Sequence, residues 1–121
     1  MVRKVFIVTN DNVFFLLLKT FIESMSYFVV CEKITNHETI ETTVGEDVKL
    51  IIIDGKMSDI SPIELIHESR YNFKIMCNIW FITEVRTTAY LQKALEVGAN
   101  RVIQKPFDAH ELAREVIKYV L

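Results

Sequence analysis

Polar side chains follow the most apolar runs of this 121-residue chain. They are a carboxylate, a hydroxyl, an ammonium group and a polar triplet: Asp54, Thr83, Lys105 and Thr9-Asn10-Asp11. A carboxylate can act as a nucleophile, while a hydroxyl and an ammonium group can stabilise the charge of a transferred group. This set suits the binding and transfer of a phosphoryl group, provided that the fold brings the side chains together.

The periodicity of the apolar residues predicts the elements that position these side chains. We expect strands at 5–8, 28–34, 50–53, 79–82 and 102–103, and helices at 13–25, 35–45, 62–71, 87–97 and 108–120. The residues expected to begin or end helices are Asp11 or Asn12, the capping-box pattern from Thr35 to Glu38, Gly45, Ser61 with Pro62 and Glu64, Gly98, and Asp108 with Glu111.

This alternation of strands and helices predicts one α/β domain over residues 1–121. Each helix carries the chain back across the sheet, so the strands are expected to be parallel. Their continuous apolar runs indicate that both faces of the sheet are covered. Ligands of such open sheets bind outside the carboxyl ends of the strands, which is where the polar residues are expected.

The composition limits the classes of function. The chain is 50% hydrophobic and 25% charged with a net charge of −2, which is typical of a globular protein and gives no electrostatic basis for binding nucleic acid. Its apolar runs are too short to span a membrane, and the N-terminus lacks the features of a secretion signal. We therefore expect a cytoplasmic protein without membrane contact.

The cysteines and histidines do not form a recognisable site. Cys31 and Cys77 are far apart in apolar surroundings, which favours buried, reduced thiols. His37, His67 and His110 are not at the spacing of metal ligands, so we expect ordinary surface or helix positions.

The ordered set of motifs resembles the CheY-like receiver domain of response regulators in two-component signalling. The resemblance rests on Asp54, Thr83 and the stretch "ALEVGANRVIQKPFDAHEL", with Met57 three residues after Asp54 and Gly98 seven before Lys105. It covers essentially the whole chain. It implies a flavodoxin-like, doubly wound sheet of five parallel strands in the order 2-1-3-4-5, with five helices in a three-layer arrangement.

The resemblance also implies roles for individual residues. Asp54 would accept a phosphoryl group from a histidine kinase, a phosphotransfer protein or a small phosphodonor. Thr83 and Lys105 would bind the phosphoryl oxygens, and Pro106 would follow a cis peptide bond. The phosphorylated domain would signal to a downstream protein partner by a change of conformation, so it is expected to be a signalling module, not an enzyme.

The chain departs from the family where Mg²⁺ binds. Receivers hold Mg²⁺ with acids at the end of the first strand, with the acceptor Asp54, and with the backbone carbonyl at the position of Lys56. Here Thr9-Asn10 replaces the acidic pair. Asn10 could offer a neutral carbonyl oxygen and Asp11 could turn inward, but Mg²⁺ prefers charged oxygens, so we expect weak or absent binding of the metal.

Three further positions differ from the family pattern. Lys56 places an ammonium group beside the acceptor, where it could partly replace the charge of the cation or pair with Asp54. Glu84 stands where receivers keep a small residue. Lys56 and Glu84 could form a salt bridge across the entrance, or they could be two solvated loop charges. Val102 replaces an aromatic residue that often reports activation, so the familiar coupling between threonine and aromatic residue is not expected.

The helix expected at 13–25 is apolar on more than one stripe. Phe15 and Leu16 stand where related receivers are polar, which indicates either extra packing against the last helix or a face for a partner protein. Trp80 lies on a strand and is expected in the core.

Other classes with a strand followed by aspartate fit less well. Phosphatases of the haloacid dehalogenase type need an acid two residues after the nucleophile, where this chain has Lys56. P-loop NTPases need a GxxxxGK loop, which the sequence lacks. The alternative that stays open is a pseudo-receiver, an interaction module that acts without phosphorylation or Mg²⁺.

Overall fold

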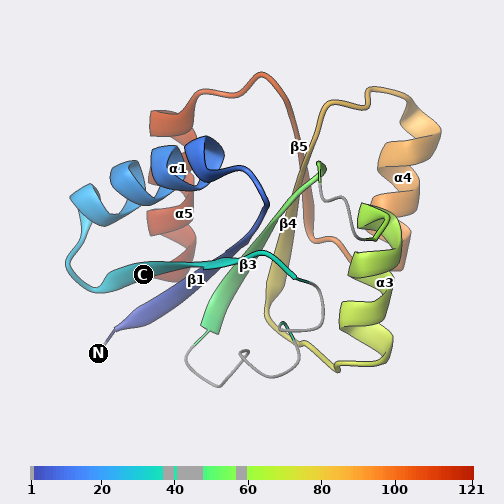
Figure 1. The fold of residues 1–121 in the computed structure, drawn as a ribbon, viewed down its shortest axis with the longest axis horizontal. Helices are drawn as coiled ribbons and strands as arrows, with labels where there is room; N and C mark the ends of the chain where they lie inside the picture. The colour runs from blue at the N-terminus through green and yellow to red at the C-terminus, as the bar shows by residue number, and fades with distance from the viewer. Residues whose placement is uncertain (1, 37–39, 41–47, 57–59) are drawn as a thin grey trace.

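The computed structural model describes residues 2–36, 40, 48–56 and 60–121, and its strands form one parallel sheet (Figure 1). The strands are β1 (Arg3–Val8), β2 (Val29–Ile34), β3 (Val48–Asp54), β4 (Asn78–Thr83) and β5 (Arg101–Gln104), in the spatial order β2-β1-β3-β4-β5. The expected α/β class, flavodoxin-like topology and strand order are confirmed.

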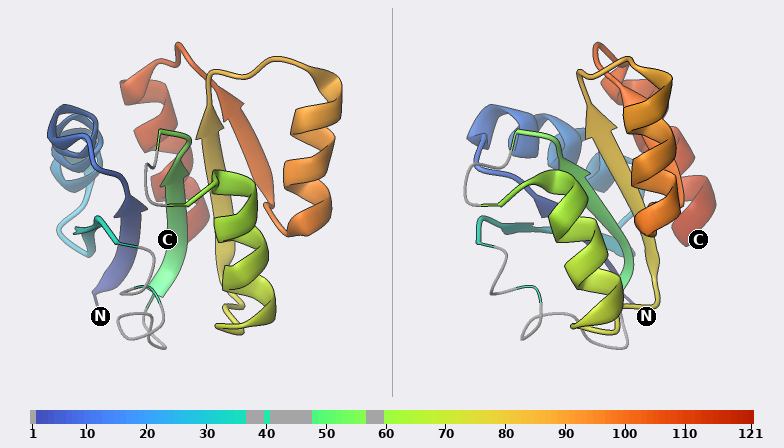
Figure 2. Two further views of the ribbon diagram at one scale, coloured as in Figure 1. Left: turned by 45° about the vertical axis from the view of Figure 1, so that its right-hand side comes forward. Right: turned by 90° about the vertical axis from the view of Figure 1, so that its right-hand side faces the viewer.

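Two pairs of helices cover the two faces of the sheet. The helices are α1 (Asn12–Met25), α3 (Pro62–Tyr71), α4 (Thr88–Val97) and α5 (Ala109–Val120). Figure 1 shows α1 and α5 on one face and α3 and α4 on the other, and the views of Figure 2 agree. The helix expected at 35–45 falls largely outside the described residues, as do His37 and Met57.

The apolar strands are buried because alternate side chains enter different cores. On β1, Val5 and Ile7 pack beneath α1 and α5, whereas Phe6 and Val8 pack toward α3 and α4. The same alternation holds along β3 and β4, where Trp80 belongs to the core under α1 and α5, as expected. A parallel strand covered on both faces needs apolar residues at every position, and this is the pattern of the sequence.

Capping follows the sequence at two helices and differs at a third. Asp11 Oδ1 accepts hydrogen bonds from the backbone N–H groups of Val13 and Phe14, and Asp108 caps α5. Ser61 occupies the N-cap position of α3, but its side chain makes no capping hydrogen bond, so the expected capping box does not form there. The fixed φ of Pro62 instead preorganises the first turn of α3.

Both cysteines are free, but they are buried to different extents. Cys31 on β2 is buried, and this burial raises the pKa of its thiol to about 12. Cys77 is only half-buried, although burial also raises the pKa of its thiol. None of the helices in the described part of the chain is long and apolar enough to cross a membrane.

The exposed surface of α1 explains part of its apolar sequence. Phe15 is half-buried and packs against the core shared with α5, so the packing explanation is confirmed for this residue. Leu16 is 55% exposed, and Val13 and Leu17 are also exposed. A partner face on α1 therefore stays a prediction.

Gly55, the residue after Asp54, packs against the backbone of β4 so closely that there is no room for a side chain. A Cβ at this residue would lie 2.8 Å from the carbonyl oxygen of Ile82, an atom of the central sheet that cannot easily move. We expect Gly55→Ala to lower the free energy of unfolding by about 1–3 kcal/mol. Urea denaturation followed by the fluorescence of Trp80 measures the change, with the exposed Glu96→Ala as control; equal stability of the two variants would contradict the prediction.

Candidate functional site

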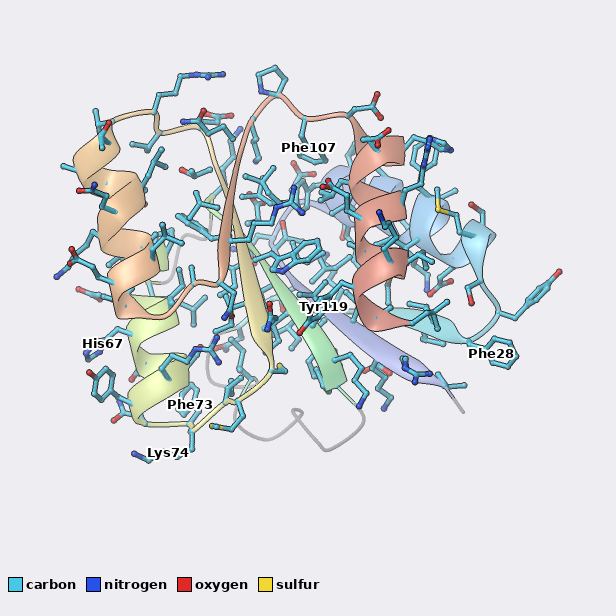
Figure 3. The ribbon with its side chains drawn as sticks, turned by 180° about the vertical axis from the view of Figure 1, so that it is seen from behind. Phe28, His67, Phe73, Lys74, Phe107 and Tyr119 are labelled. Carbon is cyan, nitrogen blue, oxygen red and sulfur yellow. The ribbon has the colours of Figure 1, made fainter. Side chains whose placement is uncertain are left out.

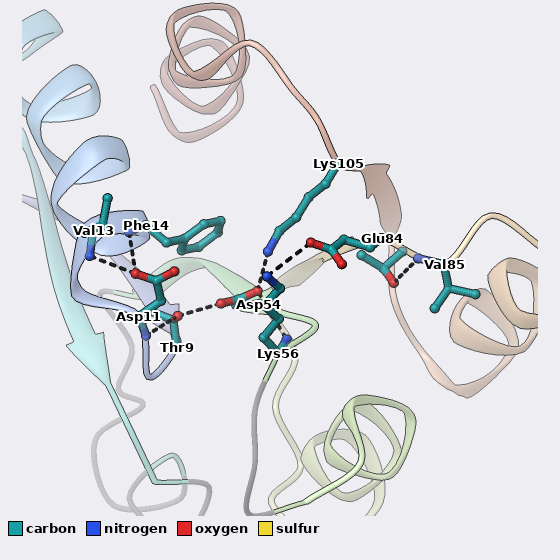
Figure 4. A network of polar contacts seen from close by, with 10 residues as sticks. Thr9, Asp11, Val13, Phe14, Asp54, Lys56, Glu84, Val85 and Lys105 are labelled. Atoms are coloured by element: carbon teal, nitrogen blue, oxygen red, sulfur yellow. Dashed lines mark hydrogen bonds and ion pairs between the residues drawn. The ribbon is translucent and has the colours of Figure 1, made fainter.

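Asp54 is a buried carboxylate whose two oxygens are both hydrogen-bonded (Figure 4). It ends β3 and is 1% exposed. Thr9 Oγ1 donates to Oδ2 at 2.7 Å, and Lys105 Nζ donates to Oδ1 at 3.0 Å. The backbone N–H of Lys56 also donates to Oδ1, at 3.2 Å. Burial of a charge is tolerated when it is paired and hydrogen-bonded, and this carboxylate meets both conditions.

Thr9 is a direct partner of Asp54. Thr9 follows β1 directly and is fully buried. Its hydroxyl donates a hydrogen bond to Asp54 and accepts one from the backbone N–H of Asp11 at 3.0 Å. From the sequence, Thr9 was expected only to replace an acidic metal ligand, and its hydrogen bond to Asp54 was not predicted. The available signal was its position: a short side chain with a donor, level with Asp54 at the same edge of the sheet.

Asp11 and Asn10 do not complete an acidic pocket. Asp11 Oδ1 caps the first turn of α1 in this structure, and a role of Asp11 as a metal ligand stays a prediction. Its carboxylate is stabilised there by the unsatisfied N–H groups and the positive end of the helix dipole. Asn10 is exposed at the start of the same turn.

Lys105 is positioned by the backbone and by aromatic rings. Its backbone N–H donates to the carbonyl oxygen of Thr83 at 2.8 Å, and the Lys105–Pro106 peptide bond is cis, as the resemblance implied. Lys105 Nζ lies 5.0 Å from the centre of the Phe14 ring, which itself packs edge-on against Phe107. An ammonium group over an aromatic face is attracted by the ring, so Phe14 is a supporting residue that sequence reasoning missed.

Thr83 lies at the same edge of the sheet as Asp54 but is not hydrogen-bonded to it in the described part of the chain. It is 3% exposed, and its hydroxyl accepts a hydrogen bond from the backbone N–H of Val85 at 3.1 Å. Within the described residues, it makes no hydrogen bond to Asp54. The structure thus brings Lys105 and Asp54 into contact and leaves the hydroxyl of Thr83 in the turn that follows β4.

Lys56 and Glu84 form a salt bridge at the mouth of the site. Lys56 Nζ lies 3.2 Å from Glu84 Oε1, and both side chains are more than half exposed. The first of the two expected arrangements is therefore the one observed, although an exposed pair of this kind contributes little to stability. The hydrogen bond and the charge of Glu84 raise the pKa of Lys56, and the charges of Asp54 and Asp11 add to the effect.

A surface hollow of about 510 Å³ opens beside these residues. It is lined by side chains of α1, the loop after β3, the loop after β4 and the loop after β5: Phe14, Leu17, Lys56, Glu84, Lys105, Pro106 and Phe107. The hollow is part apolar and part charged, and its wall includes Lys56 and Lys105, the two lysines that donate hydrogen bonds to Asp54.

The donor set does not fit the Mg²⁺ site that the resemblance implied. Among the described residues, no three His, Cys, Asp or Glu side chains come together as metal ligands. Asp54 already accepts hydrogen bonds at both oxygens, one of them from an ammonium group, and Asp11 is committed to the helix. Mg²⁺ needs near-octahedral oxygen ligands and releases its waters reluctantly. A neutral amide at Asn10 and the carbonyl of Lys56 do not replace the missing charges.

Two of the histidines sit at ordinary positions, as expected. His67 is stacked on Tyr71 with the ring centres 4.3 Å apart, and Figure 3 shows it on the outer side of α3. His110 contacts Phe21 edge-on. Neither residue is near Asp54.

Residues 5–117 match the family of the response regulator receiver domain. This chain belongs to that family. The match covers all five strands apart from the start of β1, together with the four helices up to Ile117. Receiver domains are signalling modules of two-component response regulators, so the coarse function expected from the resemblance is confirmed.

Comparison with other proteins agrees with this receiver assignment. The transcriptional regulatory protein CrdR of Helicobacter pylori is 28% identical over 119 residues, which are 98% of this chain and 55% of that protein. The chain thus spans about half the length of this curated relative.

Solved structures share the receiver fold. A two-component response regulator from Clostridium difficile superposes with a TM-score of 0.83 at 23% identity, covering 98% of this chain and 95% of that one. The chemotaxis response regulator CheY4 of Vibrio cholerae gives a TM-score of 0.79 at 18% identity over the full length of both chains.

The hydroxyl of Thr9 can be tested by its removal. Thr9→Val keeps the shape of the side chain but leaves Asp54 Oδ2 and the N–H of Asp11 without this partner, so we expect a loss of about 1–3 kcal/mol in the free energy of unfolding. Thr9→Ser retains the hydroxyl and should lose clearly less. Urea denaturation compares the two, and equal losses would show that the hydrogen bond is unimportant.

Proposed function

We propose that this receiver accepts a phosphoryl group on Asp54 from a histidine kinase or a phosphotransfer protein and passes the signal to a downstream protein. The observation that carries the proposal is the position of Asp54: a carboxylate at the carboxyl edge of the sheet, paired with the ammonium group of Lys105, which lines an open hollow. The alignment of nucleophile and cation at one edge suits phosphoryl transfer.

The chemical step forms one bond and breaks another. A carboxylate oxygen of Asp54 attacks phosphorus while the bond from phosphorus to the donor imidazole nitrogen breaks, and that nitrogen keeps the bonding electrons. The product is an acyl phosphate on Asp54. Lys105 Nζ, 3.0 Å from Oδ1 before the reaction, is placed to pair with a phosphoryl oxygen after it. The hydroxyl of Thr83 accepts from the N–H of Val85 and still has its own proton, which it can donate to another phosphoryl oxygen.

The phosphoryl group would enter between Lys56 and Glu84. Both side chains are exposed and joined by one salt bridge, so little energy is needed to separate them. The carboxylate of Glu84 repels an incoming phosphoryl group, whereas Lys56 attracts it. Opening of this pair is therefore part of the proposed reaction.

The face around the hollow suits a protein partner. Val13, Leu16 and Leu17 expose apolar surface on α1, and Leu17 also lines the hollow. Exposed apolar side chains that adjoin a reactive site are a feature of protein interfaces. We propose that the phosphodonor protein docks here. The proposal includes no direct contact with nucleic acid.

A second candidate, the pseudo-receiver, is favoured by one specific observation. Both oxygens of Asp54 are already hydrogen-bonded, and Thr9-Asn10 stands in place of the acids that hold a metal in related receivers. Such a carboxylate could serve as a purely structural link between strand ends. The domain would then signal through its surface alone.

Intact-protein mass spectrometry after incubation with acetyl phosphate or phosphoramidate separates the two candidates. We expect the mass of one phosphoryl group to be added, and Asp54→Asn to abolish the gain because an amide is not a nucleophile. Asp108→Asn is the matched control, since Asn caps a helix as well as Asp does and α5 should be intact.

The pseudo-receiver is supported instead if neither the small donors nor histidine kinases modify the protein. In that case, Asp54→Asn should also leave binding to a captured partner protein unchanged.

A further inference from the structure

We propose that the ammonium group of Lys56, held at the mouth by Glu84, takes the electrostatic place of the divalent cation, so that Asp54 binds a phosphoryl group without a metal ion. This inference rests on the proposed function and concerns how the same site works. The oxygen ligands around Asp54 carry too little negative charge to suit Mg²⁺.

The charges of the site balance without a cation. The carboxylates of Asp54 and Glu84 are matched by the ammonium groups of Lys105 and Lys56, each within one ion pair. Asp11 adds a further carboxylate, but it faces the N-terminus of α1. A pocket with an acidic pair would carry an excess of negative charge that a divalent ion neutralises. Here the hydroxyl of Thr9 and the amide of Asn10 have removed that excess.

Lys56 is tethered at the position where the replacement charge is needed. Its backbone N–H donates to Asp54 Oδ1 at 3.2 Å, and its side chain extends to Glu84, as Figure 4 shows. The ammonium group is therefore held at the mouth of the hollow, on the residue whose backbone N–H contacts the acceptor.

Phosphorylation changes the charge that Lys56 faces. An acyl phosphate carries about two negative charges, by analogy with other phosphorylated side chains. Lys105 and Lys56 together match that charge. The ammonium group has three rotatable donors and can leave the single acceptor Glu84 Oε1 for phosphoryl oxygens. In the unphosphorylated domain, the carboxylate of Glu84 therefore occupies the ion pair with Lys56 that the phosphoryl group would take over.

The experiment uses beryllofluoride, a phosphoryl mimic that coordinates a carboxylate oxygen, on the whole chain in EDTA or in MgCl₂. We expect ¹⁹F NMR to show bound beryllofluoride with the same affinity in both conditions. Lys56→Met should weaken binding on the order of tenfold, less than the loss typical of a buried donor because Lys56 is exposed. Lys56→Arg keeps the charge and should restore most of the affinity, and Lys93→Met on α4 should behave as the unmodified chain.

Calorimetric titration with MgCl₂ forms the second arm. We expect no saturable binding to the unmodified chain. The double variant Asn10→Asp, Lys56→Met restores one acid and removes the competing ammonium group, so it should bind Mg²⁺ and should need it to bind beryllofluoride. If this variant fails to fold, as thermal unfolding would reveal, the single variant Asn10→Asp replaces it.

The outcomes distinguish this inference from the proposed function. Beryllofluoride binding and phosphorylation that occur only with Mg²⁺ would overturn the role of Lys56 and leave Asp54 as the acceptor. Binding without metal that Lys56→Met does not weaken would also overturn it. A chain that binds no beryllofluoride and gains no phosphoryl mass in either condition would overturn both.

Discussion

The ion pair between the buried carboxylate of Asp54 and the partly exposed Lys105 is the interaction on which the site depends. It joins the end of β3 to the loop after β5, and the hydroxyl of Thr9 ties the end of β1 to the same carboxylate. Removing Lys105 would leave the buried carboxylate of Asp54 without its counter-charge, which is costly in a low-dielectric interior, and removing Thr9 would leave one of its oxygens without a hydrogen bond. The ends of three parallel strands are thereby held in one arrangement, and the surrounding loops must be compatible with it.

The neighbouring backbone satisfies this constraint. Gly55 passes close under β4 because it has no side chain, and its N–H donates to the carbonyl oxygen of Ile82 at 2.8 Å. The N–H of Lys105 donates to the carbonyl oxygen of Thr83, so the loop that carries the ammonium group is fixed to the adjacent strand. The chemistry-bearing side chains therefore sit on rigid strand ends, while the exposed Lys56 and Glu84 provide the movable part.

The departures from the family pattern at Thr9, Asn10 and Lys56 act on one quantity, the charge of the pocket. Replacing two acids by Thr9 and Asn10 removes negative charge, and Lys56 adds positive charge beside Asp54. In the mechanism that we propose, the ammonium group of Lys56, which is part of the chain, takes the place of an ion that must be bound from solution. The fold tolerates the exchange because these residues lie at the strand ends, outside the two cores.

The sequence alone determined the succession of strands and helices, the parallel sheet, the edge at which Asp54 and Lys105 lie, and the capping by Asp108. These follow from periodicity and from local patterns, which act over a few residues. Only the tertiary structure decided that Thr9 donates to Asp54, that Asp11 rather than Asn12 caps α1, and that Ser61 makes no capping hydrogen bond. It also decided that Arg70 donates to the carbonyl oxygens of Ile75, Cys77 and Gly98. These hydrogen bonds join α3 to the segments that precede β4 and β5. The two side-chain contacts of Asp54 span 45 and 51 residues of sequence, and their distances depend on the twist and register of the whole sheet, which no local pattern encodes.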